Sequence, residues 1–239
     1  NANNLNAMML RRRASAAPSP LQAATIAAWD MQESSGPLLP AKGDIEIPAF
    51  NSPGTKTIDG LKYRQTVKAS SQYFQIATSP VNVYSANGRT FRAFFEFTSD
   101  ATQHFYNDQL GTFPDNINSQ WSIRHNIATR LQIISKTGGG SWNVVGNVAG
   151  LATGDIIRVE ISHNAGTATF RFYNTRTAEE TVLTHPVEYS GTPPPFTIGA
   201  AGSLSEPATG AYGPMIVMNR EFTAAERAAD LTPRLFGDL

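Results

Sequence analysis

The feature that most constrains the fold is a strict alternation of apolar and more polar residues along residues 156–173. The alternation runs on both sides of residues 163–166, where Asn164 and Gly166 can supply the positive φ of a tight turn. Each half therefore offers one apolar and one polar face, as a half-buried antiparallel sheet requires. We expect a hairpin whose apolar positions pack against a second sheet: Ile157, Val159, Ile161, Ala168, Phe170 and Phe172.

Strand patterns dominate the rest of the chain, and one segment predicts a helix. The strand patterns occupy residues 25–31, 91–97, 121–125 and 130–134. Phe91 and Phe95 share one face at period two and are expected in the core. Thr223 and Glu226 form a capping-box pattern, which predicts a short helix that ends before Pro233. The sequence therefore predicts an all-β protein with one short C-terminal helix.

Length and composition fit one large β-sandwich. The chain has 239 residues, and single all-β sandwiches often exceed about 200 residues. Charged residues make up 16% of the chain, against a usual share of about 25%, as is typical of strands joined by tight turns. Cysteine is absent, which excludes a disulfide framework, a thiolate zinc site and a cysteine nucleophile. We expect residues 21–239 to form the sandwich and packing alone to stabilise it.

Charge balance and residue spacing argue against several partners. Lys and Arg number 19, as do Asp and Glu, so the chain lacks the basic excess that nucleic-acid binding needs. The four histidines lie far apart in sequence, so neither a metal nor another cofactor is expected. No apolar run approaches the ~20 residues of a membrane span. Residues 8–10 are too few for a signal-peptide core, and arginines follow them, so export is not predicted.

Residues 1–20 are expected to form a separate arm. The segment is rich in Asn, and Pro18 and Pro20 favour extended backbone. By itself it buries too little apolar surface to offset the entropy of ordering it. We expect it to dock onto other chains of an assembly, or onto copies of this chain, through apolar and basic side chains: Leu5, Met8, Met9, Leu10, Arg11, Arg12 and Arg13.

Three segments, in order, carry the pattern of a known family. Residues 28–36 (Ala-Trp-Asp-Met-Gln-Glu-Ser-Ser-Gly) look like an opening strand that ends in Glu-x-Ser-Gly. Residues 53–56 (Pro-Gly-Thr-Lys) and 69–76 are similar to the strands Pro-Gly-Lys and Ser-x-Tyr-Leu. Residues 196–199 and 215–226 look like a closing Ile-Gly strand and the start of a final helix. Residues 21–235 therefore resemble the concanavalin-A-like, or laminin-G-like, superfamily, which implies a two-sheet antiparallel jelly roll.

Unattached domains of this kind with Asn-rich arms resemble structural proteins of tailed bacteriophages. The resemblance implies a non-enzymatic virion protein, either a capsid decoration or a tail or fibre appendage, that is anchored by its arm to other virion proteins. The alternative is a carbohydrate-binding, lectin-like module of a phage or secreted protein, with a cell-surface glycan as partner. Residues 172–175 lack the glycine of the family's Tyr-Val-Asn-Gly, and no Asp and Asn cluster resembles the calcium site of its lectin branches.

Carboxylate spacing argues against glycan cleavage. A glycoside hydrolase of this superfamily would carry Glu-x-Asp-x-x-Glu on one strand, with the carboxylates about 5 Å apart for a retaining mechanism. Glu96 and Glu160 have no carboxylate two residues further on. Glu179 and Glu180 are adjacent, so on a strand they would point to opposite faces. We expect no catalytic residues and interpret these carboxylates as solvated charges.

Aromatic and amide side chains near turns are the candidates for glycan contact. Trp142 and Asn143 follow the glycines at 138–140, and Tyr106 and Asn107 fall in an expected polar loop. For Trp142, packing at the core or rim is the competing interpretation. Trp29 lies in an apolar strand pattern and is expected in the core.

Overall fold

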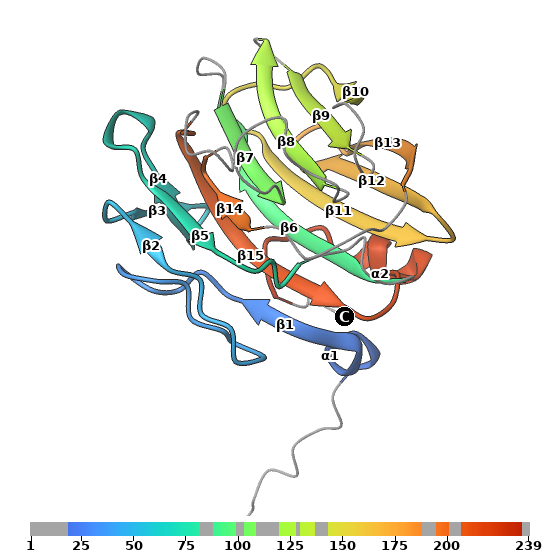
Figure 1. Ribbon diagram of the computed structural model, residues 1–239, viewed down its shortest axis with the longest axis horizontal. Coiled ribbons are helices and arrows are strands. Elements are labelled where there is room, and N and C mark those ends of the chain that lie inside the picture. The colour runs from blue at the N-terminus through green and yellow to red at the C-terminus, as the bar shows by residue number, and fades with distance from the viewer. Residues whose placement is uncertain are drawn as a thin grey trace, which may run out of the picture.

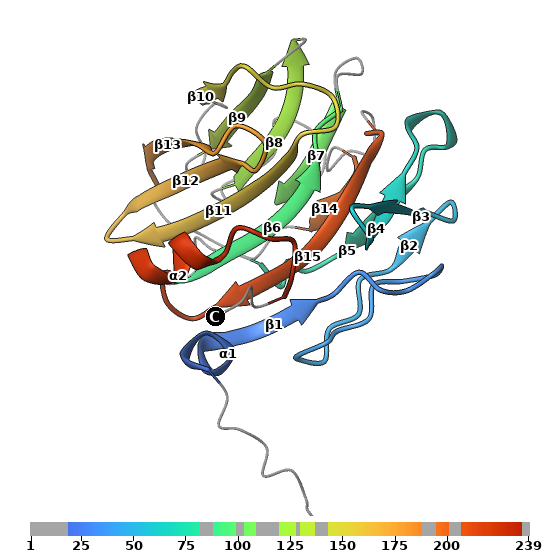
Figure 2. The same cartoon turned by 180° about the vertical axis from the view of Figure 1, so that it is seen from behind.

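The computed structural model describes residues 19–81, 88–98, 103–108, 120–127, 130–136, 143–187, 195–200 and 207–235. In these residues the chain forms two antiparallel sheets packed face to face, with short helices at the periphery (Figure 1 and Figure 2). The prediction of an all-β, two-sheet sandwich is confirmed. The docking residues expected from Leu5 to Arg13 lie outside the described residues, so docking by the arm stays a prediction.

The first sheet has eight strands in the order β13-β12-β11-β6-β15-β4-β3, and β1 pairs with the second half of β15. Strand β6 lies between β11 and β15, so strands far apart in sequence are neighbours in the centre of the sheet. The strands are β1 (Thr25–Trp29), β3 (Gly54–Ile58), β4 (Leu61–Thr66), β6 (Thr90–Glu96), β11 (Ile156–Asn164), β12 (Thr167–Asn174), β13 (Glu179–Pro186) and β15 (Gly210–Met218).

The second sheet has seven strands in the order β10-β9-β8-β7-β14-β5-β2. A 3-10 helix, η1 (Lys68–Ser70), precedes β5. The strands are β2 (Ala49–Phe50), β5 (Tyr73–Ile76), β7 (Gln103–Asp108), β8 (Gln120–Ile127), β9 (Arg130–Lys136), β10 (Asn143–Val148) and β14 (Phe196–Ile198).

The core lies between the two sheets and contains the side chains expected there. Phe91 of the first sheet packs against Trp121 and Phe196 of the second, with ring centroids 5.8 and 5.7 Å apart. Trp29 is also fully buried, and its indole nitrogen donates to the Ile45 carbonyl at 2.9 Å. The six positions predicted to be buried between the sheets are at most 1% exposed: Phe91, Phe95, Ile157, Val159, Phe170 and Phe172. The period-two prediction of the core is confirmed.

The predicted hairpin forms between β11 and β12, but its turn differs from the prediction. Asn164 pairs with Thr167, which leaves Ala165 and Gly166 as the two turn residues. Their φ values are +47° and +77°, as a tight turn that matches strand twist requires. Ala165 therefore has the positive φ that the sequence pattern assigned to Asn164.

In the part of the chain that the structure describes, two α-helices flank the sandwich, one more than the sequence predicted. Helix α2 (Ala224–Ala229) begins with the predicted capping box, in which Thr223 and Glu226 bond each other's backbone N–H groups. Helix α1 (Pro20–Ala24) begins with a second capping box, made by Ser19 and Gln22. The extended backbone expected at Pro20 is therefore wrong, because proline at the first helical position loses no hydrogen bond.

Candidate functional site

Helix α2 and the segment that follows it lie across the outer face of the eight-stranded sheet (Figure 2). Here Glu160 is only 1% exposed, because both its carboxylate oxygens accept hydrogen bonds from Arg227 of α2 at 2.8–2.9 Å. Glu96 is 7% exposed and accepts from Lys56 at 2.6 Å. The interpretation of Glu96 and Glu160 as solvated charges is therefore wrong. Each is buried because a distant segment covers it and supplies the opposite charge.

Two strand arginines fix the α2 segment to the sheet. Arg92 of β6 is fully buried and donates to the Asp230 carboxylate at 3.0 Å and to the Leu235 carbonyl at 2.6 Å. Arg158 of β11 donates to the carbonyls of Arg227 and Asp230 at 2.8 and 2.9 Å. Burial raises the pKa of the Asp230 carboxyl, and the positive charges of Arg92 and Arg158 oppose that shift. These directional contacts hold the segment in place as one wall of a cleft.

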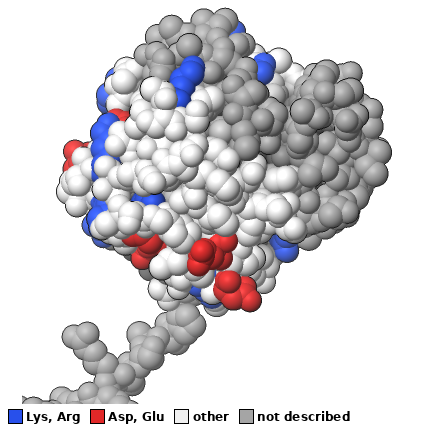
Figure 3. Space-filling model, turned by 60° about the vertical axis from the view of Figure 1, so that its left-hand side comes forward, with Lys and Arg blue, Asp and Glu red and all other residues white. Residues whose placement is uncertain are grey.

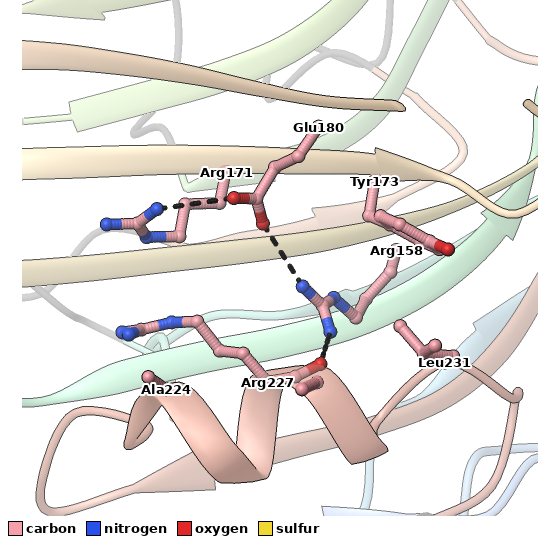
Figure 4. Close-up of a pocket in the computed structure, with 8 residues that line it drawn as sticks. Arg158, Arg171, Tyr173, Glu180, Ala224, Arg227 and Leu231 are labelled. Carbon is pink, nitrogen blue, oxygen red and sulfur yellow. Dashed lines mark hydrogen bonds and ion pairs between the residues drawn. The ribbon is translucent and has the colours of Figure 1, made fainter. Parts of the chain in front are cut away.

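The cleft lies between α2 and strands β11, β12 and β13, as Figure 4 shows. Its volume is about 590 Å³, within the range of about 300–1,000 Å³ usual for small-molecule sites. Strand register places Tyr173 directly between Arg158 and Glu180 in one cross-strand row. The cleft is lined by Arg158, Arg171, Tyr173, Glu180, Ala224, Arg227, Ala228 and Leu231.

A carboxylate, two guanidinium groups and an aromatic ring meet at the mouth of the cleft (Figure 4). Glu180 accepts from Arg158 at 3.3 Å and from Arg171 at 3.5 Å, one on each carboxylate oxygen. The guanidinium carbon of Arg158 lies 5.4 Å from the ring centroid of Tyr173. The side chain of Arg158 is almost fully buried, whereas those of Arg171 and Glu180 are 27% and 34% exposed. The accessible groups are therefore a ring, a guanidinium and a carboxylate on rigid strands.

The cleft is positively charged at its lining. Three arginines face one carboxylate there, since Glu160 lies behind Arg227. Burial disfavours the charged form of Arg227. The negative charges of Glu160, Glu221 and Glu180 outweigh this effect, so the pKa of Arg227 is raised. Arg227 is thus held as a cation by its own partner, and Arg171 is the guanidinium most open to a ligand.

The glycan contacts expected from sequence lie elsewhere. Tyr106 is on strand β7 rather than in a loop, and it is fully buried with its hydroxyl donating to the Phe94 carbonyl at 3.1 Å. An external sugar cannot reach this ring, so the interpretation of Tyr106 as a contact is wrong. Asn107 also belongs to β7, between Thr197 and Ser122 in register. Asn143 is exposed at the edge strand β10, and Trp142 lies outside the described residues.

The sequence did not predict the cleft, although some of its residues belong to the predicted hairpin. Arg158 and Tyr173 stand at polar positions of the two hairpin strands, and a turn at residues 165–166 places them opposite each other. Pattern alone treats such positions as solvent-exposed. The wall supplied by α2, which begins 50 residues after the hairpin ends at Asn174, cannot be inferred from that pattern.

The remaining surface offers weaker candidates. Phe50 and Tyr73 stack at 4.7 Å on the edge of the seven-stranded sheet, and Phe50 is 38% exposed. On the face in Figure 3, the described basic side chains lie mainly along the left edge and near the top, and the described acidic side chains gather toward the bottom. Among the described residues, no three His, Asp or Glu side chains are grouped as metal ligands. No helix in the described part of the chain is long and apolar enough to cross a membrane.

Neither a protein-family model nor a curated protein sequence matches this chain. Solved structures do share its fold. Domain 4 of AbnA, a GH43 extracellular arabinanase from Geobacillus stearothermophilus solved in complex with arabinotriose, aligns with a TM-score of 0.62 at 13% identity. The alignment covers 87% of this chain and 97% of that domain.

This chain is also similar to a part of each of two larger structures. The structure of botulinum neurotoxin type C, whose cell entry depends on two ganglioside molecules, aligns with a TM-score of 0.60 at 10% identity, over 86% of this chain and 50% of that chain. Tailspike protein 2 of Escherichia coli O157:H7 bacteriophage CAB120 gives 0.54 at 11% identity, over 77% of this chain and 26% of the tailspike. This chain spans about half the length of the toxin binding domains it matches. At these identities the similarity establishes the fold alone.

Proposed function

We propose that this chain is a non-catalytic carbohydrate-binding module with a concanavalin-A-like jelly roll, and that the cleft beneath α2 is its sugar site. The observation that carries the proposal is the meeting of the Tyr173 ring with the polar groups of Arg171 and Glu180 at an open cleft. This assignment corresponds to the alternative drawn from sequence rather than to the primary interpretation as a virion structural protein.

The chemistry of the lining suits a sugar. A pyranose or furanose has an apolar face that packs on an aromatic ring and a rim of hydroxyl groups that donate and accept hydrogen bonds. Tyr173 is partly exposed and can supply the ring surface. Arg171 can donate to sugar oxygens, and Glu180 can accept from sugar hydroxyls. Because the side chains that line the sheet side project from paired strands, they are preorganised, which lowers the entropy cost of binding.

Structures with a similar fold support a role in carbohydrate binding. The AbnA domain, which resembles this chain over almost its whole length, was solved with arabinotriose. Cell entry of botulinum neurotoxin type C depends on interaction with two ganglioside molecules. A sandwich of this architecture therefore serves as a platform for carbohydrate recognition in other proteins. We extend that role to this chain because its own surface carries a cleft of suitable size and chemistry.

The arrangement of carboxylates favours binding over hydrolysis. Most glycoside hydrolases use a pair of carboxyl groups on either side of the scissile bond. Glu180 is the one carboxylate among the described lining residues, and it is shared by two arginines. The nearby Glu160 is enclosed by Arg227.

The proposal is tested by titrating the protein with a panel of defined oligosaccharides, arabinotriose included, in a calorimeter. We expect at least one sugar to bind, and Tyr173→Ala to weaken that binding at least tenfold. Tyr73→Ala is the matched control, since Tyr73 is a partly exposed tyrosine on the other sheet. Equal loss in both variants, or no binding by any sugar, would contradict the proposal.

A virion role is a second candidate, favoured by the similarity to a phage tailspike. In that role residues 1–18 would anchor the sandwich to other virion proteins or to copies of itself. The structure refines the test: truncation should begin at Ser19, because Ser19 caps α1 and Leu21 is 1% exposed. The truncated chain should keep its melting temperature and lose assembly into particles or oligomers. Full assembly of the truncated chain would refute docking by the arm.

A further inference from the structure

The charged groups beneath α2 and around the cleft are unevenly matched. Two arginines have carboxylates of their own: Arg92 lies 2.9–3.0 Å from Asp230, and Arg227 lies 2.8–2.9 Å from Glu160. The remaining two, Arg158 and Arg171, share Glu180. The groups are the guanidiniums of Arg92, Arg158, Arg171 and Arg227 and the carboxylates of Glu160, Glu180 and Asp230. The cation without a carboxylate of its own therefore belongs to the pair at the cleft mouth.

The contacts to Glu180 show that one carboxylate does not satisfy both arginines. The distances of 3.3 and 3.5 Å exceed the roughly 2.7–2.9 Å of charge-assisted hydrogen bonds. Each guanidinium carries five N–H donors, and Arg158 also donates to the carbonyls of Arg227 and Asp230. The pair thus retains donor capacity toward a second anion.

The position of the two arginines makes this capacity available to a ligand in the cleft. Arg171 is 27% exposed and lines the cleft, so an anionic group can reach its guanidinium. Arg158 is 3% exposed, so its charge acts from a less polar environment, where it is screened less by solvent and salt. Glu221 acts on Arg227 and is not among the lining residues, so the carboxylate on the strand side of the cleft is Glu180.

We infer that the cleft selects acidic oligosaccharides, with a sugar carboxylate placed beside Arg171 and Arg158 while a ring of the same ligand packs on Tyr173. The inference rests on the proposed function and specifies its ligand class. A carboxylate matches the planar donor fork of arginine, which recognises such groups through two parallel hydrogen bonds. Glu180 then competes with the ligand carboxylate for the two arginines.

The test compares sugars that differ in the carboxylate alone. Dissociation constants are measured for trigalacturonic acid against the galactotriose obtained by reducing its carboxyl groups, and for sialyllactose against the same trisaccharide with its carboxyl group converted to the primary amide. At 50 mM NaCl we expect the acidic member of at least one pair to bind about tenfold more tightly or better. The advantage should shrink at 500 mM NaCl, because part of it is electrostatic.

Two variants of opposite expected effect separate recognition from structural damage. Arg171→Gln should reduce the acidic-to-neutral preference at least fivefold. Glu180→Gln should increase affinity for the acidic sugar, because it removes the competing carboxylate and keeps an acceptor for Arg158. Lys62→Gln is the charge-matched control, since Lys62 lies on β4 and donates to the Gln32 carbonyl. It should leave the preference unchanged.

The outcomes distinguish the two proposals. Equal binding of acidic and neutral sugars, or a preference that Arg171→Gln does not alter, overturns the acidic-ligand inference and leaves carbohydrate binding intact. Weaker acidic binding in Glu180→Gln also overturns it. Absence of binding by all four sugars and by the neutral panel overturns the proposed function, and the inference falls with it.

Discussion

The inner and outer faces of strands β6 and β11 are both buried, but by different means. On the inner face, Phe95 and Val159 are fully buried among the side chains of the opposite sheet. On the outer face, Arg92 and Glu160 are 0% and 1% exposed and are covered by a short C-terminal segment through ion pairs. Apolar packing is non-directional and tolerates small shifts, whereas a buried ion pair depends on the presence and geometry of its partner. The outer face is therefore held by a few specific contacts, and the cleft is built beside them.

We expect the greatest loss of stability when an aromatic ring is removed from the inner face. Phe95→Ala removes a buried ring that contacts Phe105 and Tyr106 at centroid distances of 4.8 and 5.6 Å. We expect the free energy of unfolding to fall by about 3–5 kcal/mol, from lost transfer energy and a residual cavity. Urea denaturation measures this, with Phe50→Ala at a 38% exposed site as the control. A loss below about 1 kcal/mol at Phe95 would contradict the described core.

Loss of a buried ion pair on the outer face should destabilise the fold next most. Replacing the pair with apolar residues tests whether the two faces are stabilised by different means. Asp230→Ala leaves Arg92 buried without its carboxylate and should cost about 3 kcal/mol. The double change Arg92→Met with Asp230→Leu removes both charges and should recover most of that loss, because buried ion pairs can often be replaced by apolar residues of similar volume. If the double variant unfolds more easily than Asp230→Ala, apolar packing cannot replace the ion pair and the comparison between the faces is wrong.

A smaller effect concerns the start of α2 and depends on pH. Hydrogen bonds from Arg220, one of them at 2.7 Å, lower the pKa of Glu226 from 4.5 to about 2. Because the folded pKa lies below the unfolded one, the pair stabilises the fold above about pH 4.5, and this contribution disappears as pH falls toward about 2.

Glu226→Gln isolates this charge, because glutamine preserves the capping box with Thr223. We expect it to lower the free energy of unfolding by roughly 1 kcal/mol at pH 7, allowing for screening at the partly exposed Arg220. The difference from the unchanged protein should narrow between about pH 4.5 and 2 in denaturation curves. A difference that stays constant over this range would show that charge is not its cause.

The smallest effect concerns the β11–β12 turn. Ala165 has a φ of +47°, which costs energy for a residue with a Cβ, and asparagine tolerates this conformation better. Ala165→Asn should raise the free energy of unfolding by about 0.5–1 kcal/mol. Gly166→Ala, at a φ of +77°, should lower it. Stabilisation by the second change, or destabilisation by the first, would refute the assignment of the turn.

The contrast between the two faces also explains what the sequence could predict. Period-two patterns identify which side of a strand faces a second sheet, so the core positions from Phe91 to Phe172 were correct. The same pattern assigns the alternate positions to solvent, and it failed at Glu160 because the residue that buries it, Arg227, is 67 residues away. Helix α1 had a local signal in Ser19 and Gln22, but the neighbouring prolines favoured an extended interpretation.

The cleft could be predicted only in part for the same reason. Arg158, Tyr173 and Glu180 lie in one cross-strand row once the hairpin register is known. Their meeting with Ala224, Ala228 and Leu231 depends on where the C-terminal segment folds back, which is decided by tertiary contacts of Arg92 and Arg158. Local sequence carries no record of such contacts.

Mapping of amide chemical shifts during titration with a bound oligosaccharide would show directly whether the cleft beneath α2 is the sugar site. If the cleft is the sugar site, the largest shifts should fall on Arg171, Tyr173 and Glu180 and on the α2 residues 224–228. Shifts confined to the Phe50 and Tyr73 edge or to Asn143, with those cleft residues unchanged, would place the sugar on the seven-stranded sheet and exclude the cleft as its site.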